Sequence, residues 1–187
     1  MVIPQVVMWG MAGLMHCINK VDPPRYTDPS NSKPMSKHTA ILRWKNLGPD
    51  FLQRRYSRAH TIHFDGGAVV PGSPSPHIVP APWSDASAVD PEEAFVASVA
   101  SCHMLWFLHV AIDAGFEALS YEDHAIGEMT TNAQGKLWIS RVTLQPAIEW
   151  HGERQPTSEE VRQLHHRAHE ECFIANSIKT EVIIASP

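Results

Sequence analysis

The fold is decided by the stretch Asp90-Pro91-Glu92-Glu93-Ala94-Phe95-Val96-Ala97-Ser98-Val99-Ala100-Ser101-Cys102-His103-Met104-Leu105-Trp106-Phe107-Leu108. Asp90 is a favourable N-cap, Pro91 fits the first helical position, and Glu93 completes a capping box. The pattern predicts a helix to about Asp113, with Gly115 as its C-terminal stop. Because this helix is apolar on nearly every face, we expect it to be buried on all sides. Its Ser, Cys and His content argues against a membrane span.

Strand patterns lie on both sides of this helix. Upstream, residues 39–45 and 59–64 alternate like half-buried strands, and a Pro/Ser-rich connection fills 71–90, with only 77–79 expected to be extended. Downstream, a capping box of Thr157 and Glu160 starts a second helix. The other predicted strands are 118–129, 137–146, 147–150 and 178–185, with a turn at 132–135. This order predicts an α+β fold with antiparallel sheets around a buried central helix.

Composition and charge limit the kinds of function that the protein can have. The chain has 187 residues, a formal net charge of -5 and a pI near 6.2. Lys and Arg form no cluster, so we expect no nucleic-acid partner and no binding to an anionic membrane surface. Three cysteines do not make a disulfide-stapled secreted scaffold, and we expect a cytoplasmic protein with reduced thiols.

The first 34 residues differ from the rest. The segment 1–18 is apolar, and 22–32 is too rich in Pro, Asn and Ser to pack. The start lacks the basic region and the cleavage site of a signal peptide. We therefore expect residues 1–34 to be a disordered or non-native extension, with Met35 as the functional start, and residues 35–187 to form a single domain.

Three residues invite a chemical interpretation, although each alone has a plain structural one. Cys102 lies inside the apolar helix and Cys172 at the end of the second helix, and free cysteine is often simply buried. Glu92 stands at a helix N-terminus, where a carboxylate is favoured by the helix dipole.

Together these residues carry a family resemblance. Asp90-Pro91-Glu92-Glu93-Ala94-Phe95 followed by Ala100-Ser101-Cys102 resembles the OsmC/organic hydroperoxide resistance family, in which a cysteine follows the glutamate by ten positions. Ala168-His169-Glu170-Glu171-Cys172 before Asn176-Ser177 resembles the segment of its second cysteine. Tyr56-Ser57-Arg58-Ala59-His60 before Phe64-Asp65-Gly66-Gly67 is similar to the family's second-strand region. The resemblance covers roughly residues 35–187.

The resemblance implies an OsmC-like fold and a two-cysteine hydroperoxide reductase that needs no cofactor or metal and acts in oxidative-stress defence. Carried over by position, Cys102 attacks the peroxide, Cys172 resolves the sulfenic acid, and Glu92 holds the activating arginine. Arg58 is the preferred arginine, with Arg54 and Arg55 open. An external dithiol reductant would reopen the disulfide, and the enzyme would be an intertwined homodimer.

Physical reasoning agrees with these roles. A thiolate attacks peroxide, yet a free cysteine with a pKa near ~8.5 is mostly protonated at neutral pH. A guanidinium favours the thiolate, and a carboxylate holds the guanidinium by a bidentate pair. Ten residues of helix span about 15 Å, so Glu92 cannot reach the site around its own Cys102. If both serve one site, a second subunit supplies one of them, which again predicts a homodimer.

Other interpretations stay open. His165, His169 and Cys172 share a helix face, which would suit zinc, but no CxxC or HExxH frame exists. A cysteine hydrolase would need a sharp glycine-rich turn that presents Cys102, and the sequence around Cys102 has no such turn. The main alternative is a non-catalytic dimeric stress or small-ligand-binding module of the same fold.

Two residues depart from the hydroperoxide-resistance branch of the family. His103 follows the attacking cysteine where that branch has an aromatic residue, and Phe173 follows Cys172 where it has proline. Both indicate an OsmC-like subgroup. Aromatic residues around the central helix, among them Trp83, Phe95, Trp106 and Phe107, would favour organic hydroperoxides over hydrogen peroxide if some of them line the site.

Overall fold

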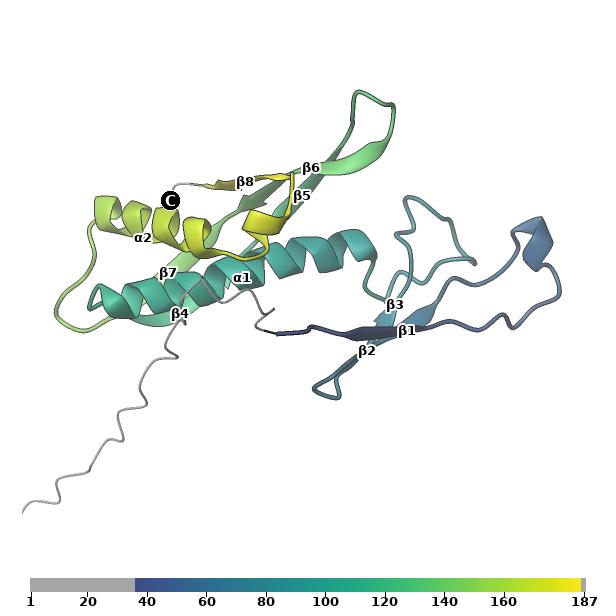
Figure 1. Ribbon diagram of the computed structural model, residues 1–187, viewed down its shortest axis with the longest axis horizontal. Helices are drawn as coiled ribbons and strands as arrows, with labels where there is room; N and C mark the ends of the chain where they lie inside the picture. Colours follow the sequence, from purple (N-terminus) through teal and green to yellow (C-terminus); the bar gives the residue numbers. More distant parts are fainter. Residues whose placement is uncertain (1–35, 186–187) are drawn as a thin grey trace, which may run out of the picture. The chain divides into compact units, whose positions relative to one another are not determined.

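The computed structural model describes residues 36–185, and from Thr39 onward these form one unit. The extension predicted for residues 1–34 lies outside the described residues. The unit contains two helices and eight strands, arranged as three small sheets (Figure 1). The strands are β1 (Ala40–Arg43), β2 (His60–Phe64), β3 (Val69–Gly72), β4 (Glu117–Asp123), β5 (Ile126–Thr131), β6 (Leu137–Leu144), β7 (Pro146–His151) and β8 (Glu181–Ile184). The helices are α1 (Pro91–Asp113) and α2 (Ser158–Glu171), and short 3₁₀ turns lie at Phe51–Gln53 and Ala175–Ser177.

Both helices begin as their sequences predict. The Asp90 carboxylate accepts a hydrogen bond from the Glu93 backbone N–H at 2.7 Å, and the Asp90 N–H donates to the Glu93 carboxylate. Thr157 and Glu160 form the same reciprocal pair at the start of α2. Gly115 follows α1 with a φ of 78°, a left-handed conformation that favours glycine. These local signals are confirmed.

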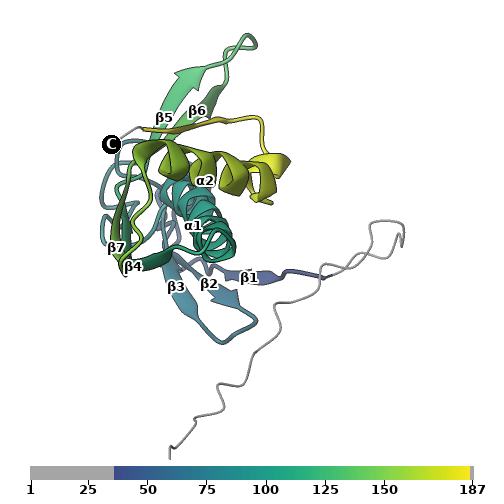
Figure 2. The ribbon, with the colours of Figure 1, turned by 90° about the vertical axis from the view of Figure 1, so that its left-hand side faces the viewer.

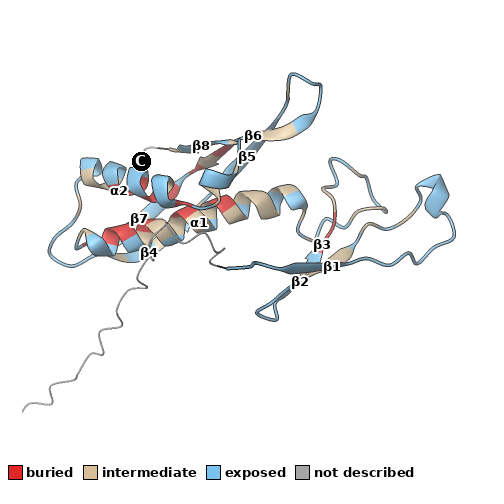
Figure 3. Ribbon diagram, viewed as in Figure 1, coloured by how far each residue is buried: buried red, intermediate tan, exposed pale blue. Residues whose placement is uncertain are grey.

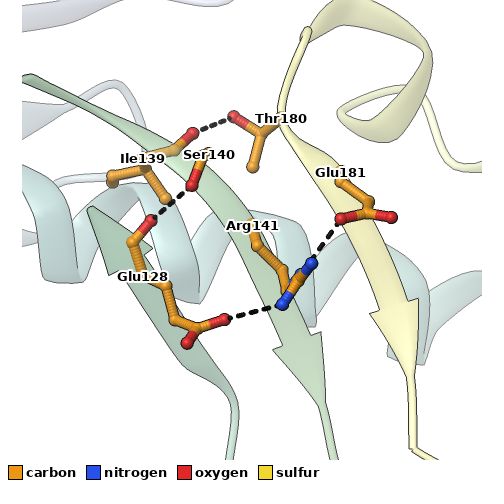
Figure 4. Close-up of polar contacts among 6 residues, drawn as sticks. All are labelled: Glu128, Ile139, Ser140, Arg141, Thr180 and Glu181. Atoms are coloured by element: carbon orange, nitrogen blue, oxygen red, sulfur yellow. Dashed lines mark hydrogen bonds and ion pairs between the residues drawn. The ribbon is translucent and has the colours of Figure 1, made fainter. Parts of the chain in front are cut away.

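The strands pair mostly as antiparallel neighbours. β1, β2 and β3 form one sheet, β4 pairs with β7, and β5 pairs with β6. The predicted α+β class with antiparallel sheets is confirmed, and one pair differs, because β8 returns parallel to β6. Figure 4 shows Arg141 of β6 between Glu128 of β5 and Glu181 of β8, where its guanidinium pairs with both carboxylates. These exposed ion pairs contribute little stability but are specific to this strand register.

Two strand predictions were wrong. β3 extends into the stretch 71–90 that was expected to be irregular, and residues 77–79 form a turn rather than an extended piece. The single strand predicted for 118–129 is two strands, β4 and β5, which belong to different sheets. The chain changes sheet at His124 and Ala125. Opposite this point the β6–β7 connection also changes sheet, and its Gln145 N–H donates to the Asp123 carboxylate at 2.7 Å.

The core lies on one side of α1. Figure 2 shows α1 end-on, with α2 beside it and the β4–β7 pair along another side. One buried cluster joins α1 to α2 around Phe107 and Leu164, and a second joins α1 to β6 around Val99, Val142 and Leu144. Gly127 of β5 permits close approach, because a Cβ there would lie 2.5 Å from a Val96 methyl. Buried residues therefore mark one helix face (Figure 3).

The opposite face of α1 stays uncovered within one chain. Leu105 is 60% exposed and Ile112 71%, and Ala97 and Ser101 continue the same stripe. The expected burial on all sides thus holds for one face only, because α2 and the sheets of a single chain cover only part of a 23-residue helix. By length and composition alone α1 could also cross a membrane, a property that the core helix of a globular domain shares.

Candidate functional site

Two thiols that are 70 positions apart in the sequence meet at the contact between α1 and α2. Cys102 lies on α1 and is partly exposed, whereas Cys172 caps the end of α2 and is 1% exposed. The two thiols lie close enough to interact, and neither is in a disulfide. The arrangement places a reachable sulfur beside a buried one, which is the order that attack followed by resolution requires.

Local structure beyond α2 fixes the position of Cys172. The Ala175 N–H donates to the Cys172 Sγ at 3.4 Å, and the Asn176 N–H donates to the Cys172 carbonyl. The Asn176 side-chain amide donates to the Glu170 carbonyl at 2.7 Å. The helix end and the following 3₁₀ turn are thereby tied around the sulfur, so that Cys172 is held against α1.

The environment of the two thiols differs. Burial raises the pKa of the Cys172 thiol to about 11, and the hydrogen bond to Cys102 acts in the same direction, while backbone donors from Ala175 and Ile174 oppose it. Cys172 is therefore a thiol at neutral pH.

Arg58 lies in an apolar hollow of about 520 Å³ in which Trp44, Phe51 and Tyr56 pack ring against ring. Its guanidinium stacks over the Tyr56 ring at 4.1 Å and donates to the Tyr56 carbonyl. The alternatives Arg54 and Arg55 are exposed in the loop before it. No hydrogen bond or ion pair joins any of these arginines to Cys102 or Cys172 within the described residues of one chain.

Glu92 lies at the start of α1, on the wall of a groove of about 820 Å³ between α1, β4 and β5. Val96, Ala100 and Ser101 continue this wall toward the turn of Cys102. Glu92 itself makes no ion pair within residues 36–185. The structure therefore brings the two predicted cysteines together and leaves Glu92 and Arg58 apart from them within one chain.

Two histidines that sequence reasoning did not assign to the site lie behind the thiols. His103 and His165 are 1% and 6% exposed, and a hydrogen bond of 3.0 Å joins His103 Nε2 to His165 Nδ1. Burial lowers the pKa of His103 to about 3, helped by the nearby His165 and His169, and burial lowers the pKa of His165 to about 4. Two features of the sequence could have pointed to these buried histidines. His103 stands among apolar residues, and His165 shares a helix face with Cys172.

The described residues contain no group of three or more His, Cys, Asp or Glu side chains that could hold a metal ion. His165 and His169 do turn toward α1 with Cys172, but His165 uses its Nδ1 for His103. Phe173, the other departure noted in the sequence, packs edge to face against Trp106 at 5.5 Å. Trp106 therefore packs against Phe173, the residue that directly follows Cys172.

Comparisons with known proteins agree on one family. The family model described as OsmC-like protein matches residues 84–186. An OsmC-like protein of unknown function from Vibrio cholerae O1 biovar eltor is 47% identical, with a TM-score of 0.78 over 81% of this chain and 99% of that one. No curated protein matches.

Two organic hydroperoxide resistance proteins share the fold at lower identity. The protein from Legionella pneumophila is 19% identical, with a TM-score of 0.58 over 81% of this chain and 96% of that one. The protein OhrB of Bacillus subtilis is also 19% identical, with a TM-score of 0.54 over 81% of this chain and all of that one. At this identity the likeness concerns the fold alone.

Proposed function

Because this chain belongs to the family of OsmC-like proteins, we propose that it is a thiol peroxidase that reduces organic hydroperoxides. The observation that carries the proposal is the close approach of Cys102 and Cys172, a partly exposed and a buried free thiol that interact where α1 meets α2. Cys102 attacks the peroxide and becomes a sulfenic acid, and Cys172 displaces hydroxide from it to form a disulfide. An external dithiol then reduces this disulfide, in the reducing environment of the cytoplasm.

The roles of the two cysteines follow from their surroundings. Cys102 is partly exposed, so a substrate can reach its sulfur. Cys172 is buried and protonated, which keeps it from reacting with peroxide first. The apolar lining of the groove beside Ser101 suits an organic hydroperoxide better than hydrogen peroxide.

The proposal is tested by counting free thiols before and after one equivalent of cumene hydroperoxide. We expect the reduced protein to lose two of its three thiols within seconds, with peptide mapping by mass spectrometry locating the new disulfide at Cys102 and Cys172. Reduced thiols after minutes would reject the peroxidase and favour a non-catalytic module of the same fold.

We further propose that the working enzyme is a homodimer. The exposed apolar stripe of α1, with Leu105 and Ile112, runs along the same helix as the groove that Glu92 lines. A second copy that covered this stripe would bury it and could bring its own Arg58 to Cys102 of the first. The arginine of the second copy would then supply the positive charge that the described residues of one chain do not place near the Cys102 thiol.

Subunit mixing tests this exchange directly. We expect Arg58→Ala and Cys102→Ser to be inactive separately, and a mixture of the two to regain about a quarter of the wild-type activity after random subunit exchange. Only a heterodimer joins an intact Cys102 to an intact Arg58 from its partner. The same mixture made with Arg54→Ala or Arg55→Ala identifies the arginine if Arg58→Ala alone remains active. A monomer at micromolar concentration, measured by sedimentation velocity, would contradict the dimer.

A further inference from the structure

His103 of α1 and His165 of α2 form a directly bonded pair inside the contact between the two helices. Nε2 of His103 and Nδ1 of His165 are 3.0 Å apart, and one of these nitrogens donates its N–H to the other. The two rings lie nearly parallel, at an interplanar angle of 13°, and Phe107 of α1 stacks on His165 at 4.3 Å. The pair is therefore a directional contact between α1 and α2, and the chemistry assigned above to the thiols does not use it.

The histidine pair and the thiols are two separate contacts between the same helices. On α1, His103 directly follows Cys102. On α2, His165 and Cys172 are seven residues apart, which is about two turns, so they lie on one face and about 10 Å apart along the axis. Ala168 lies between them on this face and is fully buried, so no large side chain separates the helices there. Because two points define a line, the histidine contact sets the angle at which α2 carries Cys172 toward Cys102.

The buried cluster that joins α1 to α2 around this pair is apolar. It contains Phe107, Val110 and Ala111 of α1 and Leu164 and Ala168 of α2. Apolar contacts are non-directional, so they tolerate small rotations or shifts of one helix against the other. A hydrogen bond weakens steeply as its distance and angle depart from ideal values, and more so in a buried site. The histidine bond therefore selects one arrangement of the two helices.

Stability alone does not account for the pair. Burying an imidazole costs free energy, and Nδ1 of His103 is buried without a partner among residues 36–185. Two apolar side chains of similar size would avoid this cost and could be as stable as the histidines or more so. A buried polar pair instead favours one arrangement of the elements that it joins.

From this geometry we propose that the hydrogen bond between His103 and His165 positions Cys172 for its attack on the sulfenic acid of Cys102. The inference rests on the proposed function, because it concerns the second step of that reaction. In this step the S–S bond forms as the S–O bond breaks, and the proton of Cys172 leaves with the hydroxide as water. The Cys172 sulfur is oxidised and the Cys102 sulfur is reduced.

The placement of α2 matters because a disulfide tolerates only a narrow range of distances and torsions. A displacement of about 1 Å is enough to slow a reaction between two held groups by as much as about a hundredfold. Neither imidazole touches the peroxide or takes the proton of Cys172. His103 and His165 are therefore positioning residues.

Substitutions that keep or remove one nitrogen test the proposal. The side-chain amide of asparagine takes the place of the Nδ1 of a histidine, and that of glutamine takes the place of Nε2, whereas leucine has a similar size and no polar atom. His165→Asn and His103→Gln therefore keep a hydrogen-bonding atom where the pair uses one. His165→Leu and His103→Leu remove it.

The two chemical steps are timed separately, by quenching after the reduced proteins receive one equivalent of cumene hydroperoxide. We expect disulfide formation to be about tenfold to a hundredfold slower in His165→Leu and His103→Leu. In His165→Asn and His103→Gln it should stay within about threefold of the wild-type rate. Sulfenic acid formation at Cys102 should be unchanged in both variants of His165, because that residue belongs to the other helix.

A double variant separates positioning from stability. His103→Leu/His165→Leu leaves no unpaired imidazole, so in denaturant unfolding it should regain the stability that each single leucine variant loses. Its disulfide step should stay as slow as in the single variants, because no directional contact replaces the bond. Val142→Ala, which weakens the other core cluster, controls for a loss of stability alone, and its disulfide step should keep the wild-type rate.

A wild-type disulfide rate in folded His165→Leu, or a rate in the double variant that recovers together with its stability, would overturn the proposal. If the wild type forms no sulfenic acid, the proposed function fails, and positioning is measured from the equilibrium of the two thiols with glutathione. There one glutathione disulfide oxidises Cys102 and Cys172 and leaves as two molecules of glutathione. The equilibrium constant is expected to fall about tenfold in His165→Leu and to be unchanged in His165→Asn. A constant unchanged in both variants would reject the positioning role independently.

Discussion

Replacing Cys102 by serine is expected to lower the rate of hydroperoxide-dependent thiol loss by at least about a thousandfold, because a hydroxyl is a far weaker nucleophile than a thiolate. Replacing Cys172 is expected to leave that first step intact. Since Cys102 is partly exposed and Cys172 is buried against it, only Cys102 can meet the substrate. The reaction of Cys172→Ser should therefore stop at a sulfenic acid, detected by mass spectrometry after trapping with dimedone.

The two variants must be compared as folded proteins. A serine hydroxyl at the buried position 172 costs about 1–3 kcal/mol if it lacks a partner, so Cys172→Ala is the matched control for packing. We expect both replacements to accumulate the same sulfenic acid. Peroxide consumption by Cys102→Ser at the wild-type rate, or a sulfenic acid located on Cys172, would reverse the assignment of roles.

Acidification is expected to destabilise the protein through the His103–His165 pair. The pKa of His165 is about 4 in the folded chain, against an ordinary value of 6.5. Between these values the unfolded chain binds more protons, so stability is complete above about pH 6.5 and falls as the pH drops toward 4. The shift corresponds to on the order of 3 kcal/mol, and the lowered pKa of His103 adds to the loss in the same direction.

Denaturant unfolding between pH 7 and pH 4.5 measures this loss, at one fixed protein concentration because dimers gain stability by mass action. His165→Gln removes one titrating imidazole, and its stability should fall less steeply over this window than that of the wild type. His151→Gln, which alters an exposed histidine, should follow the wild type. Parallel curves for wild type and His165→Gln would show that the pair is not the source of the acid sensitivity.

The features that the sequence predicted well depend on residues close together in the chain. The capping boxes of Asp90 with Glu93 and of Thr157 with Glu160 are complete within four residues, so no distant partner is needed to form them. The same holds for Gly115, whose positive φ ends α1. The order of these elements was sufficient for the α+β class, whereas Cys102 and Cys172 were proposed as site residues from the family resemblance.

The wrong strand predictions depend on distant partners. β3 contains Pro71 and Gly72, which disfavour a strand locally, and it forms because β2 pairs with it. The break between β4 and β5 is equally invisible in the local pattern of 118–129. It follows from pairing with two different strands and from the bond between the Asp123 carboxylate and the Gln145 N–H, 22 residues away.

By itself, the sequence determined the two helices and the fold class, and it singled out Cys102 and Cys172 as candidates. Only the tertiary structure decided that these thiols touch, that Cys172 is the buried partner, and that α1 keeps an exposed apolar stripe. It also decided that His103 meets His165 across two helices, which no spacing along either helix could reveal. The physical reason is that helix caps are satisfied within one turn of chain, whereas a thiol contact, a buried imidazole pair and an uncovered face depend on how α1 and α2 pack.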